Sequence, residues 1–165
     1  MSKTLVPVLL TIGVLAGCVG AEITQPPVQY VATKKLNEKG VNDFTARTFV
    51  RTDGGIKELS GVPCEFAAPG FGAKFLTPAV VATPDMGPRT PTASITCKYN
   101  EKTKLEILKP VNLTITEIEQ SANAAGAGAG LIGVIVSGIS ASSQKSRRDA
   151  NLDRYGYLDV VVVIK

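Results

Sequence analysis

The sequence predicts an α+β fold: a small disulfide-stapled antiparallel β-domain, one long glycine-zipper helix and a C-terminal buried strand. Three observations support this prediction. Short alternating segments separated by turn residues fill the region 46–99, which is typical of antiparallel strands. Small residues recur every four positions within 120–144, as they do along one face of a helix. The run 158–164 is then rich in β-branched residues, which indicates a strand.

The first seventeen residues have the composition of an export signal. A basic start at Lys3 is followed by the apolar stretch 5–15, which is too short for a bilayer span of about 20 residues. The run Leu15-Ala16-Gly17-Cys18 closes this stretch and resembles the lipobox of bacterial lipoproteins at every position. The resemblance implies that residues 1–17 are removed as a signal peptide. It also implies that Cys18 receives a diacylglycerol on its thiol and an acyl chain on its amine.

The residues after the cysteine indicate the location and the layout of the mature chain. Val19 stands where an aspartate would favour retention in the inner membrane of enteric bacteria. We therefore expect a protein that is lipid-anchored in the outer membrane and faces the periplasm. The alternative interpretation of residues 1–18 is an ordinary secretory signal in which the cysteine occurs by chance. Residues 18–29 are expected to form a lipidated tether, stiffened by the prolines at 26 and 27. Residues 30–165 are expected to form a single α+β domain.

The composition excludes several kinds of site. The chain has 18 basic and 14 acidic residues, and this modest excess does not indicate nucleic-acid binding. It has no histidine, which excludes Ser-His-Asp and Cys-His triads and histidine-ligated zinc. We therefore predict no catalytic residue, no metal ligand and no cofactor. The run Gly128-Ala-Gly130-Leu-Ile-Gly133 matches a nucleotide-binding fingerprint, but too few residues follow it to complete a dinucleotide fold, so no nucleotide is expected.

The cysteines suggest a covalent crosslink. With Cys18 assigned to lipid, Cys64 and Cys97 remain, and an oxidising periplasm favours a disulfide between them. Such a bond would stabilise the domain by roughly 3–4 kcal/mol. The alternative is two reduced, buried thiols. A catalytic redox pair is not expected, because the chain has no Cys-x-x-Cys motif.

Turn residues divide the first two thirds of the domain into short strands. Asp53-Gly54-Gly55 predicts a turn between strands over 46–52 and 56–59. The next extended segments are expected over 61–66, 73–78, 79–84 and 94–99, with a proline- and glycine-rich loop at 85–91. Two further strands are expected over 105–111 and 112–117. The cysteines at 64 and 97 then lie on strands that must come close together.

Part of this region resembles a known group of proteins. The residues concerned are Val62-x-Cys64-x-Phe66, Gly72, Thr77-Pro78, Val80-x-Ala82 and Ile95-x-Cys97-Lys98. Together they resemble a family of uncharacterised Gram-negative envelope lipoproteins with a PEGA-like β-module, over about 40 residues. The chain departs from that pattern at Ala79, where a glycine commonly follows Thr-Pro. The resemblance implies a short surface β-domain accompanied by a glycine-rich segment.

The stretch 120–144 carries no charged residue. On a helix, two rows of small residues would lie side by side and form a flat interaction face. We assign to this face Ala125, Gly126, Ala129, Gly130, Gly133, Ser137, Gly138 and Ala141. Three interpretations remain open: contact with another helix or a partner protein, a transmembrane span, or a helix buried within the domain.

The chain closes with a strand from Tyr155 to Ile164. Its β-branched run is too continuous for a half-exposed strand, so we expect the zipper helix and the opposite strands to cover both faces. Pairing is expected as well, because an exposed run of this kind is an aggregation hazard.

These features together predict a structural or protein-interaction role in an assembly of the cell envelope. The expected partners are the membrane, through Cys18, and either further copies of the chain or another envelope protein. The alternative is a binding module for a cell-wall or surface ligand such as peptidoglycan or lipopolysaccharide. No enzymatic activity is expected.

Overall fold

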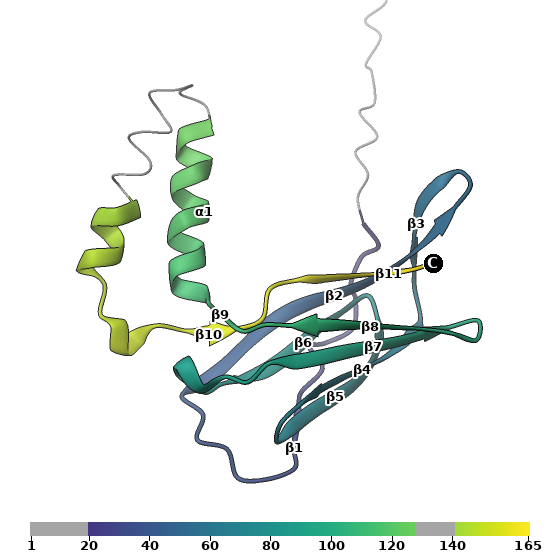
Figure 1. Cartoon of the computed structure of the whole chain (residues 1–165), viewed down its shortest axis with the longest axis horizontal. Coiled ribbons are helices and arrows are strands. Elements are labelled where there is room, and N and C mark those ends of the chain that lie inside the picture. The colour runs from purple at the N-terminus through teal and green to yellow at the C-terminus, as the bar shows by residue number, and fades with distance from the viewer. Residues whose placement is uncertain (1–19, 128–140) are drawn as a thin grey trace, which may run out of the picture.

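Two β-sheets pack face to face, and a helical arm stands at one end of this sandwich (Figure 1). The structure is a computed structural model of the 165-residue chain, and residues 20–127 and 141–165 are described here. The five-stranded sheet has the order β1–β5–β4–β7–β8 and is antiparallel throughout. Its strands are Val31–Ala32 (β1), Val62–Ala68 (β4), Phe71–Thr77 (β5), Ala93–Tyr99 (β7) and Lys102–Leu108 (β8).

The four-stranded sheet is built around one long strand, Gly40–Thr52 (β2). On one side, the first half of β2 pairs with Ala79–Asp85 (β6) and the second half with Gly55–Leu59 (β3), both antiparallel. On the other side, Val160–Ile164 (β11) pairs with the middle of β2 in parallel. A small ladder of Val111–Asn112 (β9) and Tyr155–Gly156 (β10) lies where the arm joins the sandwich.

The helical arm begins with Leu113–Ala127 (α1), and residues 141–147 are helical as well. Two short 3₁₀ turns complete the described elements, Gly87–Arg89 and Ala150–Leu152. Residues 20–33 form no helix and run along the sandwich from β3 to the edge of β5, where β1 pairs. Most of the predicted zipper helix, residues 128–140, lies outside the described part of the chain.

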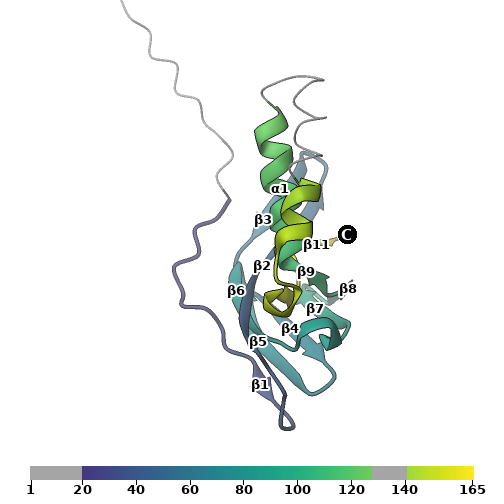
Figure 2. The same ribbon diagram turned by 90° about the vertical axis from the view of Figure 1, so that its left-hand side faces the viewer.

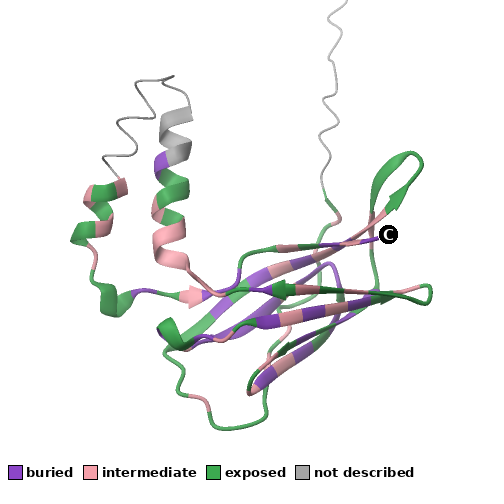
Figure 3. Ribbon diagram, in the orientation of Figure 1, coloured by how far each residue is buried: buried purple, intermediate pink, exposed green. Residues whose placement is uncertain are grey.

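Alternating side chains from both sheets fill the core (Figure 3). Strand β4 buries every second residue, and its neighbour in the same sheet, β7, does so as well. This is the pattern of strands that have one face in a core. Four rings meet between the sheets, with centroids 5.3–6.0 Å apart: Phe44, Phe66, Phe71 and Tyr157. The Tyr157 hydroxyl donates to the Pro91 carbonyl at 2.7 Å, which satisfies the one polar atom of this cluster.

The predicted disulfide between Cys64 and Cys97 is confirmed. The two residues lie directly opposite each other on neighbouring strands β4 and β7, and both are buried in the core. The hydroxyl of Thr48, from the facing sheet, lies 3.8–3.9 Å from the two sulfur atoms and accepts a hydrogen bond from Thr77 at 2.9 Å. The disulfide therefore joins two neighbouring strands within one sheet. The buried hydroxyl groups of Thr48 and Thr77 beside it are hydrogen-bonded to each other.

The α+β class is confirmed, as are the strands expected from residue 46 to 99. The single strand expected over 105–111 is divided between β8, which ends at Leu108, and β9, which begins at Val111. The strand expected over 112–117 is wrong, because α1 begins at Leu113. Asn112 decides this: its side-chain oxygen accepts from the Ile115 N–H at 3.0 Å, and its carbonyl accepts from the Thr116 hydroxyl. The first bond is that of a helix N-cap, and the second is a hydroxyl bonded to the carbonyl four residues earlier, as occurs within helices. Together they outweigh the strand preference of the β-branched residues that follow.

The single strand expected from Tyr155 to Ile164 is divided into β10 and β11, which belong to different sheets. The expected pairing of the valine-rich run is present in β11, but only one face of β11 is buried. Val162 and Ile164 point into the core, whereas Val161 is 54 % exposed on the outer face of the sheet. The expectation of cover on both faces is therefore wrong. The arm leaves the sandwich at β9 and β10, which lie before the first residue of β11, so its described residues do not reach that outer face.

Candidate interaction surfaces

The predicted interaction residues fall mainly in the arm. Cys18 lies outside the described residues, as do Ala129, Gly130, Gly133, Ser137 and Gly138. Ala125 and Gly126 belong to α1, although their burial is outside the description. Ala141 is half-buried in the second helical segment. The structure therefore describes the base of the arm and the way it is attached.

Ion pairs hold the two helical segments at the base of the arm. Arg154 donates to the Glu117 carboxylate at 2.5 and 2.6 Å, and Lys145 donates to Glu119. The second pair joins α1 to the segment 141–147, so the two helical segments lie side by side there (Figure 1). Charged side chains are thus concentrated at the base, and the stretch from 120 to 144 has none.

Asp153 joins Arg148, at the base of the arm, to Asn112, the N-cap residue of α1. Its buried carboxylate accepts from Arg148 Nε at 2.9 Å and from Asn112 Nδ2 at 2.6 Å. The hydrogen bond from Arg148 lowers the pKa of Asp153, and Asn112 adds to this against the opposing effect of burial. The carboxylate therefore remains charged and holds the start of α1 against the strand that follows the arm.

A second buried carboxylate fastens the arm to the sandwich. Asp85, at the end of β6, accepts from the Tyr155 N–H at 3.1 Å and from Asn42 Nδ2 at 3.2 Å. Asn42 also donates to the Tyr155 carbonyl at 3.1 Å. Gly156 follows, and Leu113 of α1 packs so closely on it that an added Cβ would lie 3.0 Å from Leu113 Cδ1. The arm is thus attached to the sandwich by hydrogen bonds and by packing of Leu113 on Gly156.

The N-terminal segment lies on the four-stranded sheet and then follows its edge (Figure 2). The Ala21 N–H donates to Glu58 at 2.8 Å, and Arg47 donates both to the Ala21 carbonyl and to Glu58. Although burial raises it, the pKa of Glu58 is lowered overall by these hydrogen bonds and by the charge of Arg47. Further along, Gln25 donates to the carbonyls of Leu76 and Pro78. The part of the expected tether from Gly20 onward is therefore attached to the domain.

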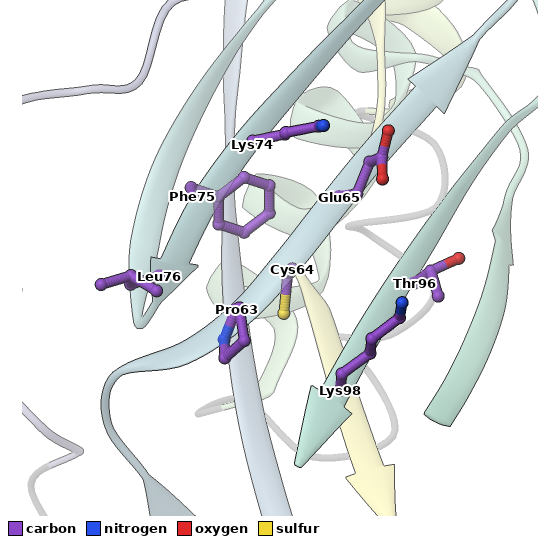
Figure 4. Close-up of a pocket in the computed structure, with 8 residues that line it drawn as sticks. All are labelled: Pro63, Cys64, Glu65, Lys74, Phe75, Leu76, Thr96 and Lys98. Carbon is purple, nitrogen blue, oxygen red and sulfur yellow. The ribbon is translucent and has the colours of Figure 1, made fainter. Parts of the chain in front are cut away.

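A shallow groove of about 410 Å³ lies on the outer face of the five-stranded sheet (Figure 4). Glu65 on β4 and Lys74 on β5 are directly opposite in register, and Figure 4 shows their charged ends reaching toward each other. Lys98 and Thr96 of β7 line the other side, and exposed Leu76 closes one end. The groove offers one carboxylate, two ammonium groups and an apolar rim.

No sequence pattern pointed to the buried carboxylates at the base of the arm. Asp85, Asp153 and Asn42 come from three distant segments, and only the fold brings them together. Asn112 was detectable, because an asparagine directly before a periodic segment is a helix-start signal. Among the residues described, no three cysteine or acidic side chains gather as a metal site would require. No helix in the described ranges combines the length and apolar character needed to cross a bilayer.

Comparison with known proteins finds no family model that matches the chain, and no similar curated protein or solved structure.

Proposed function

We propose that this protein is an outer-membrane lipoprotein that faces the periplasm and has a structural or protein-interaction role in an envelope assembly. The observation that carries the proposal is the placement of the arm. Its first helix, α1, leaves the sandwich and carries the start of the uncharged stretch, residues 120–127, away from a core whose buried cluster includes no residue of α1.

The chemistry of the arm supports a partner on this stretch. The ion pairs Arg154–Glu117 and Lys145–Glu119 keep the base soluble, and beyond them the sequence offers only small, apolar and uncharged polar residues. Glycine, alanine and serine at four-residue spacing let a second helix approach closely. An arm of this composition is stabilised when another protein surface covers it. The partner is either a second copy of the chain or another envelope protein.

Two features support the anchor and the compartment. The run Leu15-Ala16-Gly17-Cys18 resembles a lipobox, and several acyl chains on one cysteine give stable membrane attachment. The Cys64–Cys97 disulfide suits an oxidising compartment such as the periplasm.

Site-specific photo-crosslinking in intact cells tests the proposed role. A photo-reactive residue is placed in turn at 125, 129, 133 and 137, and the matched control is position 107 on the outer face of the five-stranded sheet. We expect discrete crosslinked products from the arm positions, either dimers of the chain or adducts with one envelope protein. If the arm positions give no more product than position 107, the interaction role is wrong.

The anchor is tested by replacing Cys18. We expect the intact mass of the purified protein to include a diacylglycerol and an acyl chain and to lack residues 1–17. In Cys18→Ser, the protein should leave the membrane fraction. If the wild-type mass carries no lipid, the anchor is wrong, whatever the crosslinking shows.

A binding module for a wall or surface ligand is the second candidate, and the groove on the five-stranded sheet favours it. Lys74 and Lys98 could pair with the carboxylates of a peptidoglycan stem or the phosphates of a lipopolysaccharide. Co-sedimentation with purified sacculi measures this: Lys98→Glu should reduce binding, whereas Lys109→Glu, exposed beyond the end of β8, should not. Equal sedimentation of both variants and the wild type would remove the groove from consideration.

A further inference from the structure

The outer face of the four-stranded sheet carries an apolar surface bordered by basic residues. Register places Ile56 of β3 opposite Arg51 of β2, and Phe49 of β2 between Glu58 on one side and Val163 of β11 on the other. Ile56 is 56 % exposed and Val161 is 54 % exposed on this face. We call this set the hairpin face: exposed Ile56, Arg51 and Val161, with half-buried Phe49 and Val163 between them.

The N-terminal segment lies directly on this face. Ala21 exchanges hydrogen bonds with Glu58 and Arg47, which alternate on the same side of β3 and β2 as Ile56 and Arg51. Gly20 is in contact as well, since a Cβ added to it would lie 2.8 Å from Arg47 Nη1. In Figure 2 this segment runs along the side of β2, β3 and β6, away from β7 and β8.

Covalent geometry then limits how far the anchor can be from the sheet. Cys18 precedes Gly20 by two residues, and two residues span at most about 7 Å. Ile56 is two residues from Glu58 along β3, a similar distance. Acyl chains on Cys18 therefore bring a lipid surface to within a few residues' length of Ile56, because no long spacer separates the anchor from the domain.

We infer that the hairpin face rests on the phospholipid surface that holds the acyl chains of Cys18. The inference rests on the proposed lipid anchor and goes beyond it, because an anchor alone leaves the orientation of the domain open. The occupant of the face is the head-group region of the bilayer, with Ile56 and Val161 at its apolar boundary and Arg51 at the lipid phosphates.

Charge and tethering both favour this contact. On the hairpin face the carboxylate of Glu58 is paired with Arg47 at 2.6 Å, and Arg51 is exposed beside Ile56, so this end of the face suits an anionic phospholipid. Tethering through Cys18 turns the contact into an intramolecular step at high effective concentration, so a small apolar face suffices. The outer face of the five-stranded sheet also exposes Leu105 and Ile107, but it lies on the opposite side of the sandwich from the tether.

A tryptophan reporter tests the contact, since the chain contains no tryptophan. The full lipoprotein carrying Ile56→Trp is reconstituted into vesicles of phosphatidylethanolamine with a minority of phosphatidylglycerol. The matched control is Ile107→Trp, which replaces an isoleucine that is 57 % exposed on the opposite sheet. We expect blue-shifted emission and quenching by brominated lipid for Trp at 56, and quenching by aqueous acrylamide for Trp at 107.

The other outcomes distinguish a failure of the lipid anchor from a failure of the contact between the hairpin face and the bilayer. Intact mass and vesicle flotation report the anchor: a chain without lipid that does not float contradicts the proposed function. A chain that floats while both tryptophans respond equally to acrylamide overturns the hairpin contact alone. A blue shift that grows with protein density but is insensitive to brominated lipid indicates a second copy on the face, and also overturns it.

Removal of one cation gives a second measurement on the same protein. We expect Arg51→Gln, introduced into the Ile56→Trp protein, to lower the equilibrium constant for contact between the hairpin face and the bilayer about fivefold on anionic vesicles. On vesicles of phosphatidylcholine alone the change should be much smaller. Lys98→Gln, on the opposite sheet, is the control and should leave brominated-lipid quenching unchanged. Equal effects of both substitutions on both kinds of vesicle would contradict the charge contact.

Discussion

At the scale of single residues, Gly72 shows how tightly the five-stranded sheet is assembled. It lies in β5 between Ala67 of β4 and Val31 of β1, and an added Cβ would lie 2.8 Å from the Phe66 carbonyl oxygen. Because that oxygen belongs to the backbone of a paired strand, it cannot move aside as the end of a flexible side chain would. A methyl group at this position must shift β4 or β5.

We therefore expect Gly72→Ala to lower the free energy of unfolding by about 1–3 kcal/mol, as other over-packed sites do. Gly40→Ala is the matched control, since nothing lies within 4 Å of its added Cβ at the exposed start of β2. Urea denaturation followed by circular dichroism measures both. Equal midpoints for the two variants would show that the close approach at Gly72 relaxes without cost.

The disulfide contributes at the same scale through the unfolded chain. It closes a loop with a sequence separation of 33, so its loss in Cys64→Ala/Cys97→Ala should cost roughly 3–4 kcal/mol. Reducing the wild-type protein should lower its unfolding midpoint by a similar amount, and the same reductant should leave the double variant unchanged. A midpoint of the double variant close to that of the oxidised wild type would contradict this contribution.

At the scale of elements, the sequence predicted the strands well and the helix start poorly. Alternation around Phe66, Ile95 and Cys97 is visible because each strand has one face in the core and one in solvent. The segment after Asn112 is rich in threonine and isoleucine, which favours a strand, but hydrogen bonds to the asparagine side chain and carbonyl begin a helix instead.

The position of the last strand could not be read from its own residues. Its valine-rich run resembles a strand buried on both faces, yet β11 pairs only with the middle of β2 and exposes Val161. The candidate surfaces could not be predicted from the sequence either. Ile56, Arg51 and Ala21 come together only through the pairing of β2 with β3 and through the path of the N-terminal segment. Sequence patterns give the faces of strands, whereas their neighbours depend on the whole topology.

Asn112 is the residue by which the start of the arm can be tested. Asn112→Ala removes both the cap to Ile115 and the bond to Asp153, so we expect a loss of about 1–2 kcal/mol in helix stability. Amide hydrogen exchange at Ile115 and Thr116 should accelerate accordingly. Gln120→Ala, exposed on the same helix, is the control and should leave those amides protected.

At the scale of the whole molecule, the ion pair between Arg47 and Glu58 helps to hold the start of the N-terminal segment, at Ala21, on the sheet. The lowered pKa of Glu58 means that its bonds to Ala21 and Arg47 stabilise the attached segment at neutral pH. Protonation removes this contribution, so attachment weakens as the pH falls below the ordinary carboxyl pKa of about 4.5.

The Ala21 amide resonance reports this titration directly. We expect it to shift with an apparent pKa below 4.5 in the wild type, and to show no such titration in Glu58→Gln. Asp53→Asn, at the exposed hairpin turn, should leave the titration of Ala21 unchanged. A midpoint at or above 4.5 would contradict the lowered pKa.

The parallel pairing of β11 with β2 has a consequence for when the fold can form during synthesis. The two strands are far apart in sequence, and the Thr45 N–H is joined to Asp159 across 114 positions. Contacts of such high sequence separation form slowly, because a long loop must close before they can form. Residues 160–164 must therefore be synthesised before Val162 and Ile164 can complete the core. Until then the four-stranded sheet lacks β11, and the core between the two sheets stays open to solvent.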